Sequence, residues 1–223
     1  MSKEQFLSKE NLTTTIFLNK DNYKEYMTSK KEGELAICYQ KAFAGDPWYE
    51  VGKTKSGEFT STPIGQYDQK HQETIEFVAY PTDEVIAKIR DLVENQNAVL
   101  CVEENQDQEN LITSLYWQTN PQELFDKKYS QIPAMESFLA ENIVDGAVYL
   151  DEIFTSFIRP KGNLWDIENN IYTIQKVTGT SQICFRTINK ALLQKIQTAF
   201  PDCQIFDANT DIPDNRSFVI INS

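Results

Sequence analysis

The sequence has almost no histidine, few cysteines and a shortage of positive charge. Its 223 residues include 1 His and 4 Cys, and 21 Lys+Arg stand against 33 Asp+Glu, which gives a formal net charge of −12. Binding to nucleic-acid phosphates or to an anionic membrane surface requires clustered basic residues, so we expect neither partner. With 40% hydrophobic and 12% aromatic residues, the chain can still bury a sizeable core, which argues against disorder.

The sequence also has few residues that could bind a metal or act as a nucleophilic thiol. The four cysteines, Cys38, Cys101, Cys184 and Cys203, are far apart and form no C-x-x-C pair, so we expect free thiols and no bound metal. The single histidine, His71, lies in a polar stretch, where we expect it at the surface. A Ser-His-Asp or Cys-His mechanism would need this residue, and its neighbours in the sequence offer no such arrangement.

Long apolar runs are also missing. No stretch reaches the roughly eighteen uncharged apolar residues that a membrane-spanning helix needs. The sequence starts with MSKEQFLSKE, which lacks the apolar region of a signal peptide. We therefore expect a cytoplasmic protein.

The apolar pattern predicts strands and helices in a single domain over residues 1–223. One helix, expected to begin near Thr82, has its apolar residues on a single stripe: Val85, Ile86, Ile89, Leu92 and Val93. A polar stretch at about 53–74 is expected to be a loop. We expect strands at 13–18, 98–102, 111–117, 147–158, 182–186, 204–206 and 217–221, and helices after Asp21, at 34–43, near 134–140, at 164–176 and at 189–200. This order predicts an α/β fold with a mixed, mostly antiparallel central sheet flanked by helices.

Three segments resemble the Gcn5-related N-acetyltransferase (GNAT) family, in the family's order and spacing. YQKAFAGDPWYE (residues 39–50) resembles the end of the first helical region, and YLDEIFTSFIRPKG (149–162) resembles the central strand with its acetyl-CoA loop. ICFRTINKALLQKIQTAF (183–200) is similar to the next strand and the last helix. The resemblance runs from about residue 13 to the end. It implies a GNAT-like fold and transfer of an acetyl group from acetyl-CoA to an amine.

The segment RPKGN at 159–163 is suited to holding a pyrophosphate. A strand that turns into a helix presents unpaired backbone N–H groups and the positive end of the helix dipole. An ordinary turn with solvated cations is the alternative. The resemblance implies that the cofactor-binding residues are Ile153, Thr155, Arg159, Lys161, Gly162, Asn163, Leu164 and Asn189. For Asn189, a helix N-cap is the alternative.

Two carboxylates on the expected central strand are candidate bases. Amide formation needs a group that removes the proton of the acceptor ammonium. Asp151 and Glu152 point to opposite faces of a strand, so only one of them can serve, and the resemblance favours Glu152. Pairing with Lys or Arg is the alternative for both. Trp48 and Tyr116 are the expected acceptor-side residues because aromatic faces attract ammonium groups, with core packing as the alternative.

Three residues depart from the family pattern. Pro160 has no N–H to donate, Leu164 replaces a small residue, and Ile196 stands where many members have the tyrosine that protonates the leaving thiolate. These departures favour two alternatives: an inactive binding or regulatory protein with the same fold, and an unrelated α/β interaction module. The sequence does not decide whether the acceptor amine belongs to a small molecule or to a protein. It also leaves open whether the protein forms a homodimer.

Overall fold

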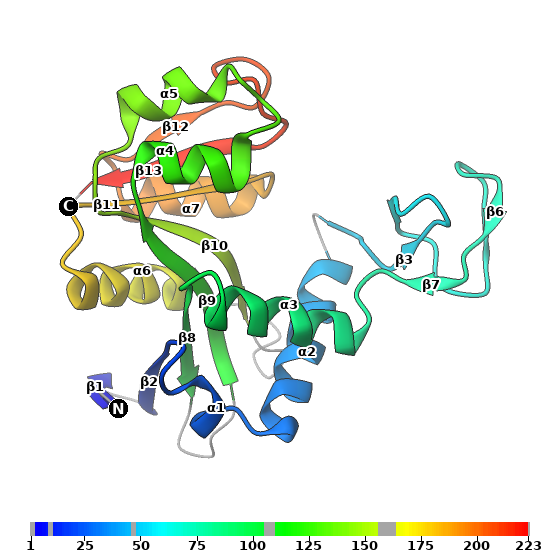
Figure 1. Ribbon diagram of the computed structural model, residues 1–223, viewed down its shortest axis with the longest axis horizontal. Helices are drawn as coiled ribbons and strands as arrows, with labels where there is room; N and C mark the ends of the chain where they lie inside the picture. The colour runs from blue at the N-terminus through cyan, green and yellow to red at the C-terminus, as the bar shows by residue number, and fades with distance from the viewer. Residues whose placement is uncertain (1–2, 9–10, 46–47, 105–109, 156–163, 223) are drawn as a thin grey trace. The chain divides into compact units, whose positions relative to one another are not determined.

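The central feature of the computed structural model is an eight-stranded sheet (Figure 1). The structure describes residues 3–8, 11–45, 48–104, 110–155 and 164–222. The strand order is β1 (Lys3–Ser8), β2 (Asn11–Leu18), β8 (Val99–Glu104), β9 (Asn110–Thr119), β10 (Ala147–Thr155), β11 (Gln182–Thr187), β13 (Ser217–Asn222) and β12 (Gln204–Phe206). β10 and β11 are parallel, whereas β1–β2, β11–β13 and β12–β13 are antiparallel. The expected fold class, a mixed and mostly antiparallel sheet flanked by helices, is confirmed.

The helices and strands that the sequence predicted are present, with some ends shifted. Residues 156–158 of the expected 147–158 strand lie outside the described residues. The helices are α1 (Tyr23–Tyr26), α2 (Ser29–Ala44), α3 (Thr82–Glu94), α4 (Pro121–Leu124), the π-helical η1 (Phe125–Tyr129), α5 (Met135–Asn142), α6 (Leu164–Thr178) and α7 (Lys190–Ala199). Of these elements, the sequence did not predict β1, α4 and η1.

The chain divides into two compact units. The first consists of Met1–Asn97, Val102–Leu111 and Phe154–Pro160, and the second of Ala98–Cys101, Ile112–Ile153 and Lys161–Ser223. Each unit is described separately below. The expectation of a single domain over residues 1–223 stays a prediction.

In the first unit, α2 and α3 pack against each other. α2 begins after Thr28, whose hydroxyl accepts a hydrogen bond from the backbone N–H of Lys31 (3.4 Å). Glu32 of α2 also binds Arg90 of α3 at 2.9 Å, so an ion pair supports the apolar packing. Of the stripe that the sequence predicted for α3, Val85, Ile89, Leu92 and Val93 are buried, whereas Ile86 is half-buried.

The 52–78 segment of the first unit contains two small sheets, where we expected a loop without elements (Figure 1). One sheet has the order β4 (Phe59–Thr60), β3 (Gly52–Lys53) and β7 (Phe77–Val78), and the other pairs β5 (Tyr67–Asp68) with β6 (Glu73–Thr74). Ile75 is fully buried. Asp68 accepts hydrogen bonds from the Thr60 hydroxyl and from the backbone N–H groups of Lys70 and His71. A buried isoleucine and a buried carboxylate therefore organise a segment that has no apolar periodicity.

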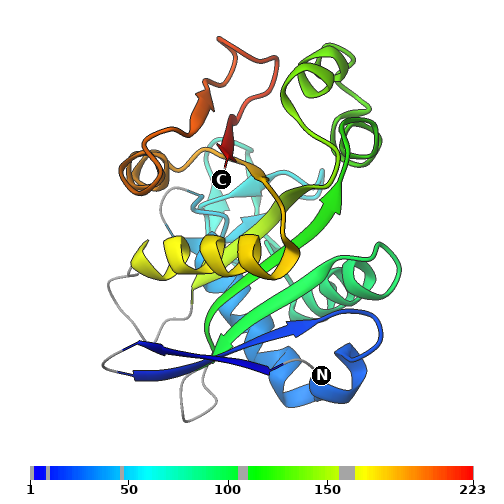
Figure 2. The same ribbon diagram turned by 90° about the vertical axis from the view of Figure 1, so that its left-hand side faces the viewer.

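In the second unit, α5 and α7 lie on opposite sides of β12 and β13 (Figures 1 and 2). Phe138 of α5 packs edge-on against the rings of Phe206 and Phe218, with centroid distances of 4.9 and 5.4 Å. α4 begins after Asn120, whose side chain accepts a hydrogen bond from Glu123 N (2.9 Å). The sequence Asn-Pro-Gln-Glu at 120–123 is a helix start signal that could have revealed α4.

Candidate functional site

Strands β10 and β11 pair over a short distance and then separate. Among the described residues, their parallel pairing consists of Val148 with Ile183 and Tyr149 with Cys184. β11 by contrast pairs with β13 from Gln182 to Thr187. Within the described residues of the second unit, no pairing therefore joins β10 to β11 from Leu150 to Ile153. Backbone N–H and C=O groups that leave a partner strand in this way are able to pair with an extended ligand.

The two candidate carboxylates on β10 differ in their surroundings. Asp151 Oδ1 lies 2.6 Å from Lys128 Nζ, and the Asp151 side chain is only 9% exposed. Glu152 is half-buried on the same strand. For Asp151, the structure therefore shows the alternative to a base, which is pairing with a lysine.

Lys128 is a residue that the sequence did not single out. It lies in η1, and π-helical turns are rare and often occur at functional sites. The Nζ atoms of Lys128 and Lys127 each lie 5.1 Å from the ring centroid of Trp117, which packs against Tyr149 at 5.1 Å. Trp117 Nε1 is buried and has no hydrogen-bond partner among the described residues. η1 therefore brings two cations to one indole and one of them to Asp151.

Tyr149 on β10 and Tyr129 on η1 are buried side chains of the same unit. Burial raises the pKa of both hydroxyls well above the ordinary value of 10.0. Arg186 of β11 lies 5.4 Å from the Tyr129 ring centroid and pairs with Asp214 at 3.2 Å. Both phenols consequently stay protonated at neutral pH and keep a hydrogen that can be donated.

The expected pyrophosphate segment falls largely outside the described residues, which do not include Arg159, Lys161, Gly162 and Asn163. Its two borders are described: β10 ends at Thr155, and α6 begins at Leu164. Ile153, near the end of β10, is half-buried. The expected order of strand, short segment and helix is present.

Asn189 is the N-cap of α7. Its side-chain oxygen accepts a hydrogen bond from the backbone N–H of Leu192 (3.0 Å), so the N-cap alternative is what the structure shows for this residue. Ile196 of the same helix is 2% exposed. Because its side chain has no polar group, it cannot protonate a leaving thiolate.

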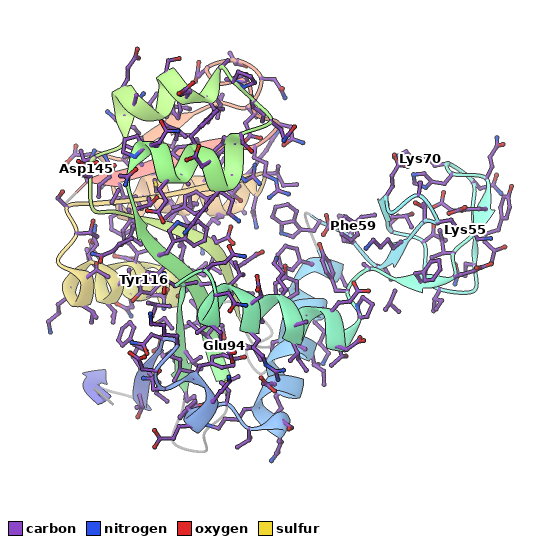
Figure 3. The ribbon with its side chains drawn as sticks, in the orientation of Figure 1. Lys55, Phe59, Lys70, Glu94, Tyr116 and Asp145 are labelled. Carbon is purple, nitrogen blue, oxygen red and sulfur yellow. The ribbon has the colours of Figure 1, made fainter. Side chains whose placement is uncertain are left out.

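Trp48 belongs to the first unit, where it joins an aromatic cluster with Tyr39, Phe43, Phe59 and Tyr80 (Phe59 is labelled in Figure 3). The centroid of Phe43 lies 5.5 Å from that of Trp48 and 4.6 Å from that of Tyr39. The Tyr80 hydroxyl donates a hydrogen bond to Glu50. Ring faces next to a carboxylate provide two favourable contacts for an ammonium group.

Tyr116 belongs to the second unit and lies on β9 (Figure 3). It is 2% exposed, and burial raises the pKa of its hydroxyl above the ordinary value. The structure therefore places Tyr116 in the core, as the packing alternative described.

His71 is not at the surface, contrary to our expectation. Its side chain is 12% exposed, with Nδ1 3.2 Å from Asp68 Oδ1 and Nε2 3.4 Å from Glu58 Oε2. The expectation was wrong because the small sheets of the 52–78 segment fold around the imidazole.

The described part of the chain offers little for metal or thiol chemistry. No group of three or more His, Cys, Asp and Glu side chains there could hold a metal ion. The four cysteines are free, and burial raises the pKa of the Cys38, Cys184 and Cys203 thiols, which makes them poor nucleophiles at neutral pH. None of the helices in this part of the chain is long and apolar enough to cross a membrane.

Comparison with known proteins gives matches to solved structures only. No family model matches the sequence, and no curated protein matches it significantly. The AHL synthase LasI is 9% identical, with a TM-score of 0.52 over 95% of this chain and 90% of its own. The C-terminal condensation domain of Ebony, solved in complex with beta-alanyl-dopamine, is 9% identical, with a TM-score of 0.51 over 95% of this chain and 98% of its own.

A GNAT-family acetyltransferase from Listeria monocytogenes is also similar. It is 12% identical to this chain, with a TM-score of 0.48 over 99% of each chain. Likeness at such identities concerns the fold alone. The chain shares its fold with LasI and with the Ebony condensation domain, and this mixed α/β fold is of the class that the resemblance to the Gcn5-related N-acetyltransferases implied.

Proposed function

We propose that the protein is an acyl-CoA-dependent N-acyltransferase that transfers an acetyl group from acetyl-CoA to an amine. The observation that supports this most is the separation of β10 from β11 after Tyr149. Under the resemblance, this stretch of the central strand receives the pantetheine arm. LasI is a synthase and the Ebony domain a condensation domain, so the choice of acetyl-CoA belongs to the proposal and not to the fold likeness.

The residues that would hold the cosubstrate are those that the family resemblance implies, and acetyl-CoA itself supplies the activated acetyl thioester. The backbone of Ile153 and Thr155 pairs with the pantetheine arm. The pyrophosphate lies at the N-terminal end of α6, a helix of 15 residues, where Leu164 and the preceding residues bind it: Arg159, Lys161, Gly162 and Asn163. Asn189 contributes its NH₂ group, because its oxygen caps α7.

Glu152 is the base in this proposal. It takes a proton from the acceptor ammonium, and the amine nitrogen then forms a C–N bond with the thioester carbonyl carbon. The C–S bond breaks, and the nitrogen releases its second proton to water to give the neutral amide. Asp151 does not serve, because Lys128 holds its carboxylate. The leaving thiolate takes its proton from water, because Ile196 provides none.

The acceptor is a cationic or aromatic amine. Trp48 and the other rings of the aromatic cluster offer faces to such a group, and Glu50 adds a negative charge beside Tyr80. The acceptor belongs to a small molecule or a protein. All four cysteines are free, as is usual in the reducing cytoplasm, where we propose that the reaction takes place.

A second candidate function is an inactive protein that binds acyl-CoA or a related ligand. The observation that favours it is Ile196, which is buried and apolar at the position of the family's acid. Pro160 favours it as well, since proline has no backbone N–H to donate, and so does Leu164, which replaces the small residue that the family has where the backbone approaches the phosphate closely.

Calorimetric titration with acetyl-CoA tests the binding part of the proposal. We expect the wild type to bind. Arg159→Glu should weaken binding about 10- to 100-fold, because a charge-assisted hydrogen bond contributes about 1.5–3 kcal/mol. Lys30→Glu is the matched control, since the Lys30 side chain is 85% exposed and Lys30 is remote from Arg159 in the sequence. The affinity of this variant for acetyl-CoA should equal that of the wild type. A wild-type protein without any heat of binding would contradict the proposed transfer from acetyl-CoA.

Release of free thiol in the presence of a panel of cationic and aromatic amines tests the transfer. Glu152→Gln should lower kcat by about 10²- to 10⁴-fold while the affinity for acetyl-CoA stays the same. Glu141→Gln, at an exposed position of α5, should behave as the wild type. Tight binding of acetyl-CoA without transfer to any amine would favour the inactive binding protein.

A further inference from the structure

A groove of about 650 Å³ lies in the second unit between α7, β12 and the chain that follows β12. Figure 2 shows α7 beside β12. Small-ligand sites usually have volumes of about 300–1,000 Å³, so the groove has a suitable size. Its apolar side chains are Ile188, Leu193, Ile205 and Ala208. They form an apolar lining that suits apolar groups of a ligand.

One stripe of α7 faces the groove. It consists of Lys190, Leu193, Gln194 and Gln197, which are spaced i, i+3, i+4 and i+7 and so share one side of the helix. The core stripe of α7 is different and contains the buried Leu192 and Ile196. One side of α7 therefore packs into the core, and another side lines the groove.

The groove has one positive and one negative side chain, Lys190 and Asp207. In the described part of the chain, neither side chain has an ion-pair or hydrogen-bond partner. Lys190 is the first residue of α7, where the helix dipole adds to its attraction for a carboxylate. Asp207 attracts an ammonium group. The two charges cancel, which disfavours a polyanion such as a nucleotide.

The remaining polar side chains of the groove carry amides or a hydroxyl: Gln194, Gln197, Asn215 and Ser217. An amide side chain both donates and accepts, as a peptide group does. We propose that the groove binds a short zwitterionic peptide with apolar side chains. The peptide's carboxylate pairs with Lys190, its ammonium group with Asp207 and its peptide group with the amides. This site does not depend on the proposed acyl transfer.

Calorimetric titration with the dipeptide Leu-Leu, without acyl-CoA, tests the proposal. We expect Leu-Leu to bind the wild type. N-acetyl-Leu-Leu lacks the ammonium group, Leu-Leu amide lacks the carboxylate, and Gly-Gly lacks the apolar side chains. Each should bind at least roughly tenfold more weakly, which corresponds to the loss of about 1.4 kcal/mol.

Two variants test which side chain binds the carboxylate of the peptide and which binds its ammonium group. Lys190→Met should weaken Leu-Leu about tenfold and leave the affinity for Leu-Leu amide unchanged, since that ligand has no carboxylate to lose. Asp207→Asn should weaken Leu-Leu and leave N-acetyl-Leu-Leu unchanged. Lys195→Met and Asp202→Asn are the controls, because both residues are exposed near α7 and neither lines the groove. Melting followed by circular dichroism verifies that each variant folds.

The proposal is overturned by either of two results. One is that Leu-Leu does not bind the folded wild type at millimolar concentrations. The other is that Leu-Leu binds but folded Lys190→Met and Asp207→Asn bind it as well as the control variants do.

Discussion

At the scale of single residues, Asp151 and Glu152 show that the role of a side chain depends on its neighbours in the folded structure as well as on its position in the sequence. Strand alternation was sufficient to nominate both carboxylates and to predict that they face different ways. It could not show that Lys128 pairs with Asp151, because this contact joins segments that are remote in the sequence. His71 is a similar case, since its two carboxylate partners come together only when the 52–78 segment folds. The choice of Glu152 as the base stays a prediction.

The ion pair between Lys128 and Asp151 leads to a stability prediction. Lys128→Met leaves a largely buried carboxylate without its partner, so the free energy of unfolding should fall by about 1–3 kcal/mol. Lys127→Met is the matched control: Lys127 approaches the same indole but pairs with the more exposed Glu123, and its loss should cost at most about 1 kcal/mol. Urea denaturation measures both. Equal losses of unfolding free energy in the two variants would contradict the conclusion that the pair of Lys128 with Asp151 stabilises the fold more than the pair of Lys127 with Glu123.

At the scale of elements, predictability depended on length. α3 was predicted because its apolar stripe repeats along 13 residues, whereas α4 and η1, of 4 and 5 residues, are too short for any period to be visible. The same reason applies to the two-residue strands of the 52–78 segment. Such short elements depend on individual close contacts instead of on a repeated pattern.

Gly52 of β3 provides one such contact. A Cβ at this position would collide with the carbonyl oxygen of Thr62 and come within 2.6 Å of Ile75 Cγ2. We expect Gly52→Ala to lower the Tm and to speed amide hydrogen exchange throughout the 52–78 segment. Gly33→Ala is the control in α2: nothing lies within 4 Å of the new Cβ, and stability should rise by about 0.5–1 kcal/mol. A Gly52→Ala variant as stable as Gly33→Ala would argue against the packing described for β3.

Asp68 makes the 52–78 segment sensitive to acid. The Thr60 hydroxyl and the N–H of His71 donate to its carboxylate and hold its pKa well below the ordinary value of 3.8. Because the pKa is lowered in the folded state, the stabilisation is present above pH 3.8 and is lost as the pH falls below it. Asp68→Asn should therefore flatten the acid-unfolding curve below this pH, as measured by intrinsic fluorescence. Asp145→Asn, at an exposed position labelled in Figure 3, should leave the curve unchanged.

At the scale of the whole molecule, the order of the longer elements was readable and their pairing was not. Apolar runs predicted the strands of the central sheet from β2 to β12, but β1 was missed because Lys3, Glu4 and Gln5 make its first half polar. The separation of β10 from β11 has no sequence signature, since Ile183 and Phe185 belong to one continuous buried run. The phosphate role of residues 159–163 could be inferred only from charge and family resemblance, and it stays a prediction.

Amide hydrogen exchange with and without acetyl-CoA tests most directly whether this chain binds acyl-CoA along β10. Addition of acetyl-CoA should slow exchange at residues 150–155 and in the first turn of α6, because these N–H groups acquire partners on the ligand. The α2 and α3 helices serve as the internal reference and should exchange at the same rate in both samples. Unchanged exchange at residues 150–155 under saturating acetyl-CoA would contradict the proposed function.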